Sequence, residues 1–329
     1  MASSGEDGPG RPRPEGGRIA WEAAPDPLRG RIEEVLGGTV TQGRDLSGGS
    51  SPGLVALLRT RAGAEAFVKA VETRYVPEAR LHRDEAAIAA ALPRTAPTPR
   101  LLGSFEDEAW VGLVFEAVHG RPPQRTWPAA EAERVLALVS ELAATGTPAP
   151  EPVPAAEARR PRLGGWRWFT EDEDRPRRLA EVSPWAARHL EDLCALEQRG
   201  LIAARGESLV HFDLHTRNVL VGEKRVWAVD WAFATRGNPL IDLVTLLSSM
   251  SAEGVEAQPY AAGHPLAARA DPEELNGLIA AHAGFCLAAS FRPAPPRRQP
   301  ILDLKREFGL GALRWLGARV ACASSASAR

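Results

Sequence analysis

Cysteine and lysine are both scarce in this chain of 329 residues. The cysteines are widely spaced and form no C-x-x-C pair, which argues against a disulfide framework and a cysteine zinc site; they are Cys194, Cys286 and Cys322. A reducing cytoplasm is therefore the expected compartment. Arginine supplies nearly all of the positive charge, so each lysine is a candidate for a specific role; they are Lys69, Lys224 and Lys305.

Long apolar runs and a large excess of one charge are also missing. The longest apolar stretch, residues 278–291, is shorter than the ~20 residues of a membrane span, so no membrane partner is expected. The formal net charge of −2 gives no overall electrostatic footprint for nucleic acid. Residues 1–17 lack the apolar core of a secretory signal and are predicted to be a disordered leader, and residues 323–329 a flexible tail.

The spacing of apolar residues and turn signals predicts an α+β protein with two lobes. Asp26 and Pro27 start a helix, and a pair of apolar runs then reads as a hairpin preceded by a glycine-rich turn. A helix over residues 78–92 and two further strands complete a small, strand-rich N-terminal lobe, residues 18–118. Residues 119–322 are mainly helical and form the larger C-terminal lobe. The turn of the first lobe carries Gly48, Gly49 and Gly53.

A lysine and a glutamate of the first lobe both lie among apolar neighbours. Lys69 shares a strand face with Phe67 and Val71, and Glu85 lies in the apolar stripe of the following helix. Leaving either charge unpaired there would cost several kcal/mol, on the order of the usual penalty for a buried lone charge, so we expect the two to pair. Alternatively, each side chain reaches solvent by itself. A lysine beside a glycine-rich turn can donate to nucleotide phosphates.

A cluster of polar residues in the second lobe lies between two apolar runs, in the stretch SLVHFDLHTRNVLVG. A turn at residues 222–225 reverses the chain, which brings Asn218 within about one or two pairing positions of Asp230. Amide and carboxylate oxygens side by side suit Mg²⁺. Asp213, on the loop before Asn218, is placed to accept a proton from a hydroxyl.

This pattern resembles the catalytic loop of the protein-kinase-like fold. The motif H-x-D-x-x-x-x-N, made by His211, Asp213 and Asn218, is followed one hairpin later by Asp230. The longer stretch LVHFDLHTRNVLV…AVDWAFATRGNPLIDL is more similar to the aminoglycoside phosphotransferase branch, which includes choline kinase-like small-molecule kinases. The resemblance extends over about residues 28–315 and is strongest over 208–247.

The resemblance implies a role for each matched residue and a cofactor set of ATP or GTP with Mg²⁺. It makes Asp213 the catalytic aspartate and His211 a brace of its loop, and it leaves His215 to touch the transferred phosphate or stabilise the loop. The remaining roles are two magnesium ligands, a phosphate-binding lysine with its partner, a glycine-rich phosphate loop and a backbone hinge that holds adenine. The magnesium ligands are Asn218 and Asp230, and the phosphate-binding lysine is Lys69 with Glu85 as its partner. The phosphate loop carries Gly48 and Gly49, and the adenine hinge is Glu116 to Val118. Asp242 opens the next helix.

The expected partner is a hydroxylated small molecule bound by a monomer or weak dimer. An aminoglycoside-like or other antibiotic acceptor follows from the resemblance. The acidic run at residues 171–174 would suit a cationic acceptor, although a charge run is more often a solvated face. Trp166 and Trp168 flank this run and are either acceptor-binding walls or core residues.

Two other functions fit parts of the same pattern. His211, Asp213 and His215 alternate along the chain and, on one strand face, would provide three ligands for a metal-dependent hydrolase. That interpretation leaves Lys69, Glu85, Asn218 and Asp230 unexplained. A non-catalytic, kinase-like nucleotide-binding module is the other alternative, although every matched catalytic position carries the expected residue type.

Overall fold

A computed structural model describes residues 17–46, 52–156 and 162–327. The chain divides into two compact units, the first comprising residues 1–86 with 101–117 and the second residues 87–100 with 118–329. The sequence placed residues 87–100 in the first lobe. They group with the second unit because Ile88 belongs to its hydrophobic core and Ala228 donates a backbone hydrogen bond of 2.8 Å to Pro97.

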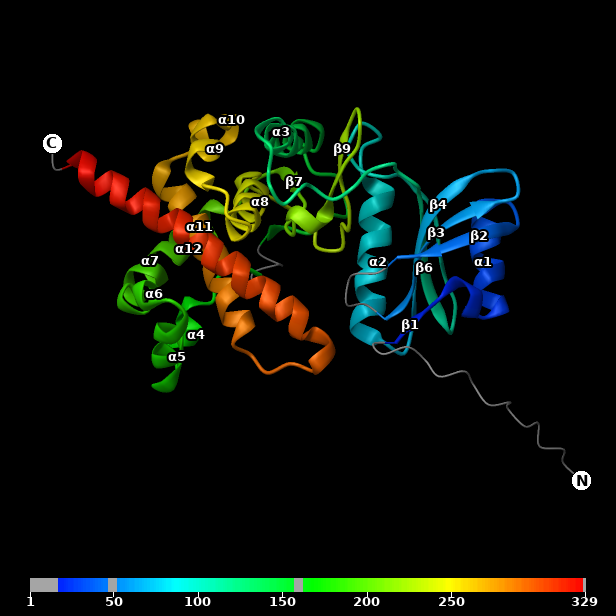
Figure 1. Cartoon of the computed structure of the whole chain (residues 1–329), viewed down its shortest axis with the longest axis horizontal. Coiled ribbons are helices and arrows are strands. Elements are labelled where there is room, and N and C mark those ends of the chain that lie inside the picture. The colour runs from blue at the N-terminus through cyan, green and yellow to red at the C-terminus, as the bar shows by residue number, and fades with distance from the viewer. Residues whose placement is uncertain (1–16, 47–51, 157–161, 328–329) are drawn as a thin grey trace, which may run out of the picture. The chain divides into compact units, whose positions relative to one another are not determined.

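The first unit is built on a six-stranded sheet with the strand order β1-β3-β4-β6-β5, and β2 also pairs with β3 (Figure 1). All pairings are antiparallel except β1 with β3. The predicted hairpin is β3 and β4, and the two further predicted strands are β5 and β6. The strands are β1 (Arg18–Ile19), β2 (Val40–Asp45), β3 (Gly53–Thr60), β4 (Glu65–Glu72), β5 (Leu101–Glu106) and β6 (Trp110–Glu116).

Helices accompany this sheet where the sequence predicted them. The 3-10 helix η1 (Trp21–Ala23) precedes α1 (Asp26–Leu36), whose Pro27 has no N–H to leave unsatisfied in the first turn. Leu28 and Ile32 of α1 are buried in the core of the first unit with Trp21. The longer α2 (Val76–Ala91) begins in the first unit and ends in the second.

The second unit is mainly helical: α11 packs against α7 and α12, α12 also packs against α8, and α11 and α12 run side by side (Figure 1). Helices α7 and α11 approach each other closely where both carry glycine. A Cβ on Gly200 of α7 would lie 2.1 Å from the Gly277 carbonyl oxygen of α11, so only glycine fits at position 200. The helices are α3 (Ala129–Thr145), α4 (Trp166–Thr170), α5 (Asp174–Val182), α6 (Pro184–Arg188), α7 (Leu190–Ala203), α8 (Leu240–Ala252), α9 (Ala257–Gly263), α10 (Pro265–Ala268), α11 (Pro272–Ser290), η4 (Pro296–Arg298) and α12 (Gln299–Ser327). Helix α12 thus continues into the predicted tail, where alanine favours helix.

Short strands interrupt these helices at the polar cluster found in the sequence. The predicted hairpin is β8 paired with β9, in the register Val219 opposite Ala228. A second antiparallel pair, β7 with β10, was not predicted, since β10 is only three residues long. These elements are β7 (Ser208–Val210), η3 (Thr216–Asn218), β8 (Val219–Val221), β9 (Val226–Ala228) and β10 (Thr235–Gly237).

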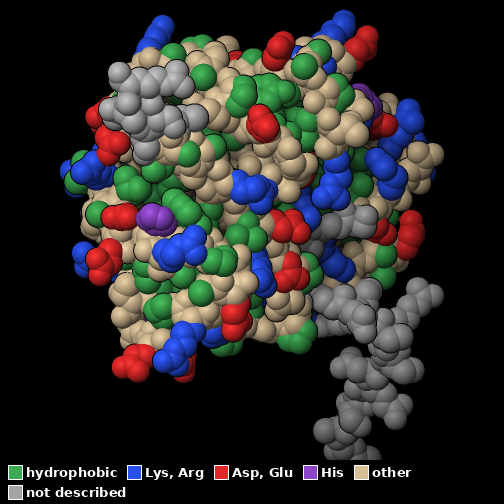
Figure 2. All heavy atoms as spheres, turned by 60° about the vertical axis from the view of Figure 1, so that its left-hand side comes forward, with side chains coloured by type: hydrophobic (Ala, Val, Ile, Leu, Met, Phe, Trp, Pro, Cys, Tyr) green, Lys and Arg blue, Asp and Glu red, His purple; other side chains and the backbone are tan. Residues whose placement is uncertain are grey.

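Acidic and basic side chains are interspersed on the face shown in Figure 2, in keeping with the near-zero net charge. No described helix combines the length and the hydropathy that a bilayer-spanning segment needs.

Candidate functional site

The lysine and glutamate of the first unit form the expected ion pair. Lys69 lies on the central strand β4, between Val55 of β3 and Leu113 of β6, and its Nζ contacts Glu85 Oε2 on α2. Only 12% of the Lys69 side chain and 3% of the Glu85 side chain are exposed. The sheet therefore fixes the lysine and the helix fixes its counter-charge.

The turn before β3 is only partly described, because Gly48 and Gly49 lie outside the described residues. Gly53, which opens β3, has a left-handed backbone (φ 96°), and a Cβ there would lie 2.1 Å from the Ala70 carbonyl oxygen. Glycine is therefore required at this position. Glu116 is the last residue of β6 and Val118 follows two residues later, so the segment proposed to hold adenine leaves the end of a central strand.

Asp242, in the first turn of α8, anchors the loop that carries Asp213. The Asp242 carboxylate accepts backbone hydrogen bonds from His211 (2.8 Å) and Phe212 (2.9 Å). Phe212 has a left-handed backbone (φ 67°), and the two bonds hold it in that strained conformation. Burial raises the pKa of Asp242 to about 6, against the opposing effect of His211 and of the two bonds.

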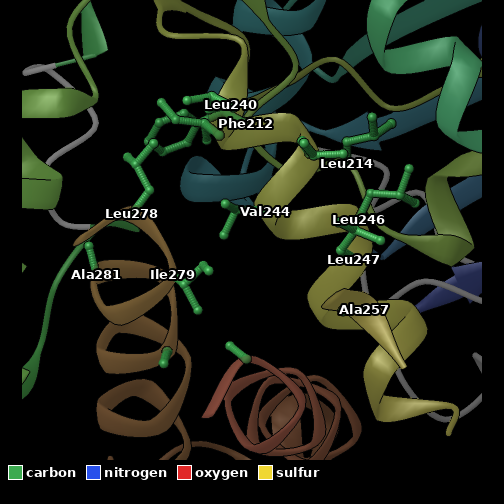
Figure 3. Close-up of a cluster of buried hydrophobic side chains, with 14 of the residues drawn as sticks. Phe212, Leu214, Leu240, Val244, Leu246, Leu247, Ala257, Leu278, Ile279 and Ala281 are labelled. Carbon is green, nitrogen blue, oxygen red and sulfur yellow. The ribbon is translucent and has the colours of Figure 1, made fainter. Parts of the chain in front are cut away.

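Apolar side chains of the same loop point into the core of the second unit. Phe212 and Leu214 lie with Val244 and Leu246 of α8 and with Leu278 of α11 in one buried cluster (Figure 3). The polar residues at 211, 213 and 215 alternate with these apolar ones. Burial of Phe212 and Leu214 thus places Asp213 on the opposite side of the loop from the core.

His211 braces this loop against the hairpin. Its side chain is fully buried, its Nε2 donates to the Val229 carbonyl oxygen (2.9 Å), and its ring packs 4.6 Å from that of Trp231. Its Nδ1 has no hydrogen-bond partner among the described residues. The brace ties the loop to the strand end that carries Asp230.

The three-ligand zinc arrangement does not form, because His211 is turned toward Val229 and away from a common centre with Asp213 and His215. Within the described ranges, no group of three or more His, Cys, Asp and Glu is arranged to hold a metal ion. The alternating spacing predicted a shared strand face, but the left-handed Phe212 breaks the strand.

The Asp213 carboxylate is surrounded by cationic and imidazole groups. Its Oδ1 accepts a hydrogen bond of 2.6 Å from Arg162 Nη2, and its Oδ2 lies 3.9 Å from His215 Nε2. Burial raises the pKa of Asp213, but the charge of Arg162, helped by His215 and Lys305, outweighs burial and holds this pKa well below its usual range. Burial lowers the pKa of His215, whose ring packs against Phe308. Asp213 is therefore ionised at neutral pH.

Asn218 and Asp230 are brought together by the hairpin as predicted. The Val229 amide donates to the Asn218 carbonyl oxygen (2.9 Å), so Asp230 is one residue beyond the cross-strand neighbour of Asn218. The Asn218 Nδ2 donates to the Asp213 carbonyl oxygen (3.0 Å), which turns its Oδ1 away from that carbonyl. Asp230 is exposed and has a left-handed backbone (φ 70°). An amide oxygen and a carboxylate are ligand types that suit Mg²⁺ with waters and phosphate oxygens as its other ligands.

Three of the four acidic residues at 171–174 are paired within their own segment. Arg175 lies 3.3 Å from Glu171 and 4.0 Å from Asp172, and Arg177 lies 3.1 Å from Asp174. This local pairing favours the solvated-face interpretation of the run. Trp166 is fully buried and donates to the Ala280 carbonyl oxygen, so it belongs to the core.

Sequence reasoning missed Arg162 as a partner of Asp213. Arg162 lies in a segment rich in proline and arginine, where no periodic pattern singles out one arginine from its neighbours. Lys305 could have been found, because the scarcity of lysine marks it.

A buried histidine beside this site gives a testable pH dependence. Burial of His282 on α11, helped by the charges of Lys305 and Arg162 and opposed by Asp213, lowers its pKa to about 3. Below its ordinary pKa of about 6.5 the unfolded chain binds a proton that the folded chain does not, so stability falls as the pH falls. His282→Gln removes this term. We expect the unfolding free energy of the natural protein, relative to the variant, to fall by about 1.4 kcal/mol between pH 7.5 and 5.5.

Chemical denaturation of the two proteins at both pH values measures this difference. His189→Gln is the matched control, because His189 is exposed and its side chain lies beside Asp192 at the surface. A difference between natural protein and His282→Gln that is the same at both pH values would contradict the buried, neutral state of His282.

A sheet-bound lysine–glutamate pair and a helical unit with an aspartate–asparagine loop define a kinase-like phosphotransferase of small molecules that acts on hydroxyl groups. The chain belongs to the phosphotransferase enzyme family, whose model matches residues 42–281. No curated protein matches the chain in sequence.

Solved structures with the same fold include other phosphotransferases. A thermostable mutant of aminoglycoside phosphotransferase APH(4)-Ia, in a ternary complex with ADP and hygromycin B, has 15% identity and a TM-score of 0.56, covering 88% of this chain and 97% of that one. An aminoglycoside phosphotransferase from Alicyclobacillus acidocaldarius has 14% identity and a TM-score of 0.55, covering 87% and 93%. Spectinomycin phosphotransferase APH(9)-Ia, in complex with ADP and spectinomycin, has 13% identity and a TM-score of 0.54, covering 86% and 97%. At these identities the likeness shows the protein-kinase-like fold.

Proposed function

We propose that this protein transfers the γ-phosphoryl group of ATP or GTP, with Mg²⁺, to a hydroxyl group of a small molecule. The observation that carries the proposal is the ionised Asp213, held on the same short loop as Asn218 and one hairpin from Asp230. Family membership and the ADP complexes of two structural relatives support it.

Asp213 orients the acceptor. One carboxylate oxygen is occupied by Arg162, and the other accepts a hydrogen bond from the acceptor hydroxyl, which aligns the hydroxyl oxygen for in-line attack. Because Arg162 keeps the pKa of Asp213 low, the carboxylate acts mainly by orientation and takes the proton late, as the new O–P bond forms.

Each unit carries residues that we assign to nucleotide binding. Lys69 donates to its phosphates, and Glu85 keeps the lysine pointed in one direction. The backbone of Glu116 to Val118, at the end of β6, is assigned to the adenine. Asn218 and Asp230 hold Mg²⁺, which supplies neutralisation of the phosphate charge. The predicted cytoplasmic location and the monomer or weak dimer stay predictions.

The test is a mass-spectrometric screen of hydroxylated compounds with Mg-ATP and with Mg-GTP. The panel includes aminoglycosides, spectinomycin, macrolides, sugars and hydroxy acids, and the expected result is a product heavier by one phosphoryl group. Nucleotide binding measured by calorimetry with no product from any member would contradict the proposal and favour the binding-module alternative.

A further inference from the structure

The Arg162 guanidinium, which pairs with Asp213, lies beside two aromatic rings, and Lys305 lies beside one of the same rings. The Arg162 guanidinium stacks 3.5 Å from the centroid of the Phe233 ring and lies 5.4 Å from that of Phe285. The Lys305 Nζ, which comes from α12, lies 3.9 Å from the centroid of the same Phe285 ring. Four separate segments therefore contribute to one cationic and aromatic cluster.

Arg162 is held in this position by the segment that follows it. The Gly164 amide donates to the Ala281 carbonyl oxygen of α11 (2.8 Å). The buried Glu197 carboxylate on α7 then accepts from the amides of Gly165 (2.6 Å) and Trp166 (2.9 Å). Such anchoring to two helices makes Arg162 a pre-organised group, whose ordering costs little when a ligand binds.

The cluster has more positive than negative charge. Asp213 is the sole ion-pair partner of Arg162 among the described residues, and none of them lies within ion-pair distance of Lys305. The Arg162 Nε is buried and has no hydrogen-bond partner in the described part of the chain. His282, also buried nearby, is neutral because burial lowers its pKa to about 3. Two cations thus face one carboxylate.

A second carboxylate would complete this cluster, whereas a cationic ligand would meet two like charges. An arginine fork pairs with a carboxylate through parallel hydrogen bonds, and a lysine adds a point charge. The two phenylalanine rings provide apolar walls for the body of a ligand. The acidic run at residues 171–174, the one feature of the sequence that suggested a cationic acceptor, is already paired at three of its four residues with Arg175 and Arg177.

We propose that Arg162, Lys305, Phe233 and Phe285 form the acceptor subsite, and that the acceptor is a hydroxylated carboxylate with an apolar or planar body. This inference rests on the proposed function and names the substrate class for the same site. The carboxylate pairs with Lys305 beside the Arg162 guanidinium, while the hydroxyl of the acceptor meets the Asp213 oxygen that does not bind Arg162. Lys305 is then a specificity-determining residue.

The test compares three probes that differ mainly in charge: benzoate, benzamide and benzylamine. Their binding to the full-length protein is measured by ligand-observed NMR without nucleotide, so phosphoryl transfer is not needed. We expect benzoate to bind the natural protein most tightly and benzylamine least. Lys305→Gln should weaken benzoate binding by about tenfold and leave benzamide unchanged, and Lys305→Arg should restore most of the loss.

Lys224→Gln is the matched control, because Lys224 is exposed in the β8–β9 turn, and it should bind benzoate as the natural protein does. Equal binding of benzoate and benzamide, tighter binding of benzylamine, or a benzoate preference that survives Lys305→Gln would each overturn the inference. An inactive protein that binds benzoate through Lys305 would overturn the proposed function and leave the anion subsite standing. Turnover of acceptors without any charge preference would overturn the subsite alone.

Discussion

Asp213→Asn is expected to lower kcat by about 10²- to 10⁴-fold, the range typical for loss of a positioned acid–base group. Asparagine fits the same space and keeps an oxygen for Arg162, but it cannot offer a charged oxygen to the acceptor hydroxyl. The folded structure should therefore persist while transfer fails. Steady-state kinetics with Mg-ATP and any acceptor found in the screen measure the effect, and nucleotide affinity should change by less than about threefold, because Asp213 faces the acceptor.

The control for this variant is Asp303→Asn. Asp303 is an exposed residue of α12 that accepts a hydrogen bond from Gln299, which asparagine can also accept. Its kcat should equal that of the natural protein. If Asp213→Asn kept its kcat within about threefold of the natural protein, orientation by Asp213 would contribute little, and the assignment of this residue as the catalytic group would be wrong.

The arrangement of the catalytic loop could be predicted because its information is local. The turn between β8 and β9 fixes the register, and the register places Asp230 beside Asn218. Apolar residues at 212 and 214 similarly point Asp213, which lies between them, away from the core. The Lys69–Glu85 pair was predictable for the same reason, since each charge lies on a strand face or helix stripe whose direction the sequence shows.

The surroundings of Asp213 could not be predicted, because they depend on contacts between distant segments. Arg162 and Asp213 are 51 residues apart, and Lys305 reaches the cluster from a helix near the end of the chain. No periodicity links an arginine of an irregular segment to a loop, and only the packing of α7 and α11 around Gly164 and Trp166 decides where Arg162 lies. The fold class can therefore be predicted from the periodicity of the sequence, whereas the groups that surround Asp213 can be found only from the tertiary structure.

The second large effect is expected at the buried pair of the first unit. Glu85→Gln removes the negative charge of Glu85 from beside the Lys69 ammonium, only 12% of whose side chain is exposed. Removing one member of a buried pair typically costs about 3–5 kcal/mol. We expect the free energy of local opening of β4 and α2, measured by hydrogen exchange with mass spectrometry, to fall by about that amount. Lys69→Met combined with Glu85→Leu should recover most of it, since apolar residues of similar volume replace both charges.

Glu106→Gln is the matched control, because Glu106 pairs with Arg83 in the same unit while 47% of its side chain is exposed. Solvent screens that pair, so hydrogen exchange of the sheet should not change. An equal effect of the two glutamine variants would show that burial of Lys69 does not decide the cost. The double variant separates two roles of the lysine. If it regains stability yet binds Mg-ATP far more weakly than the natural protein, Lys69 is needed for nucleotide binding and not for folding. Recovery of both stability and nucleotide affinity would contradict phosphate binding by Lys69.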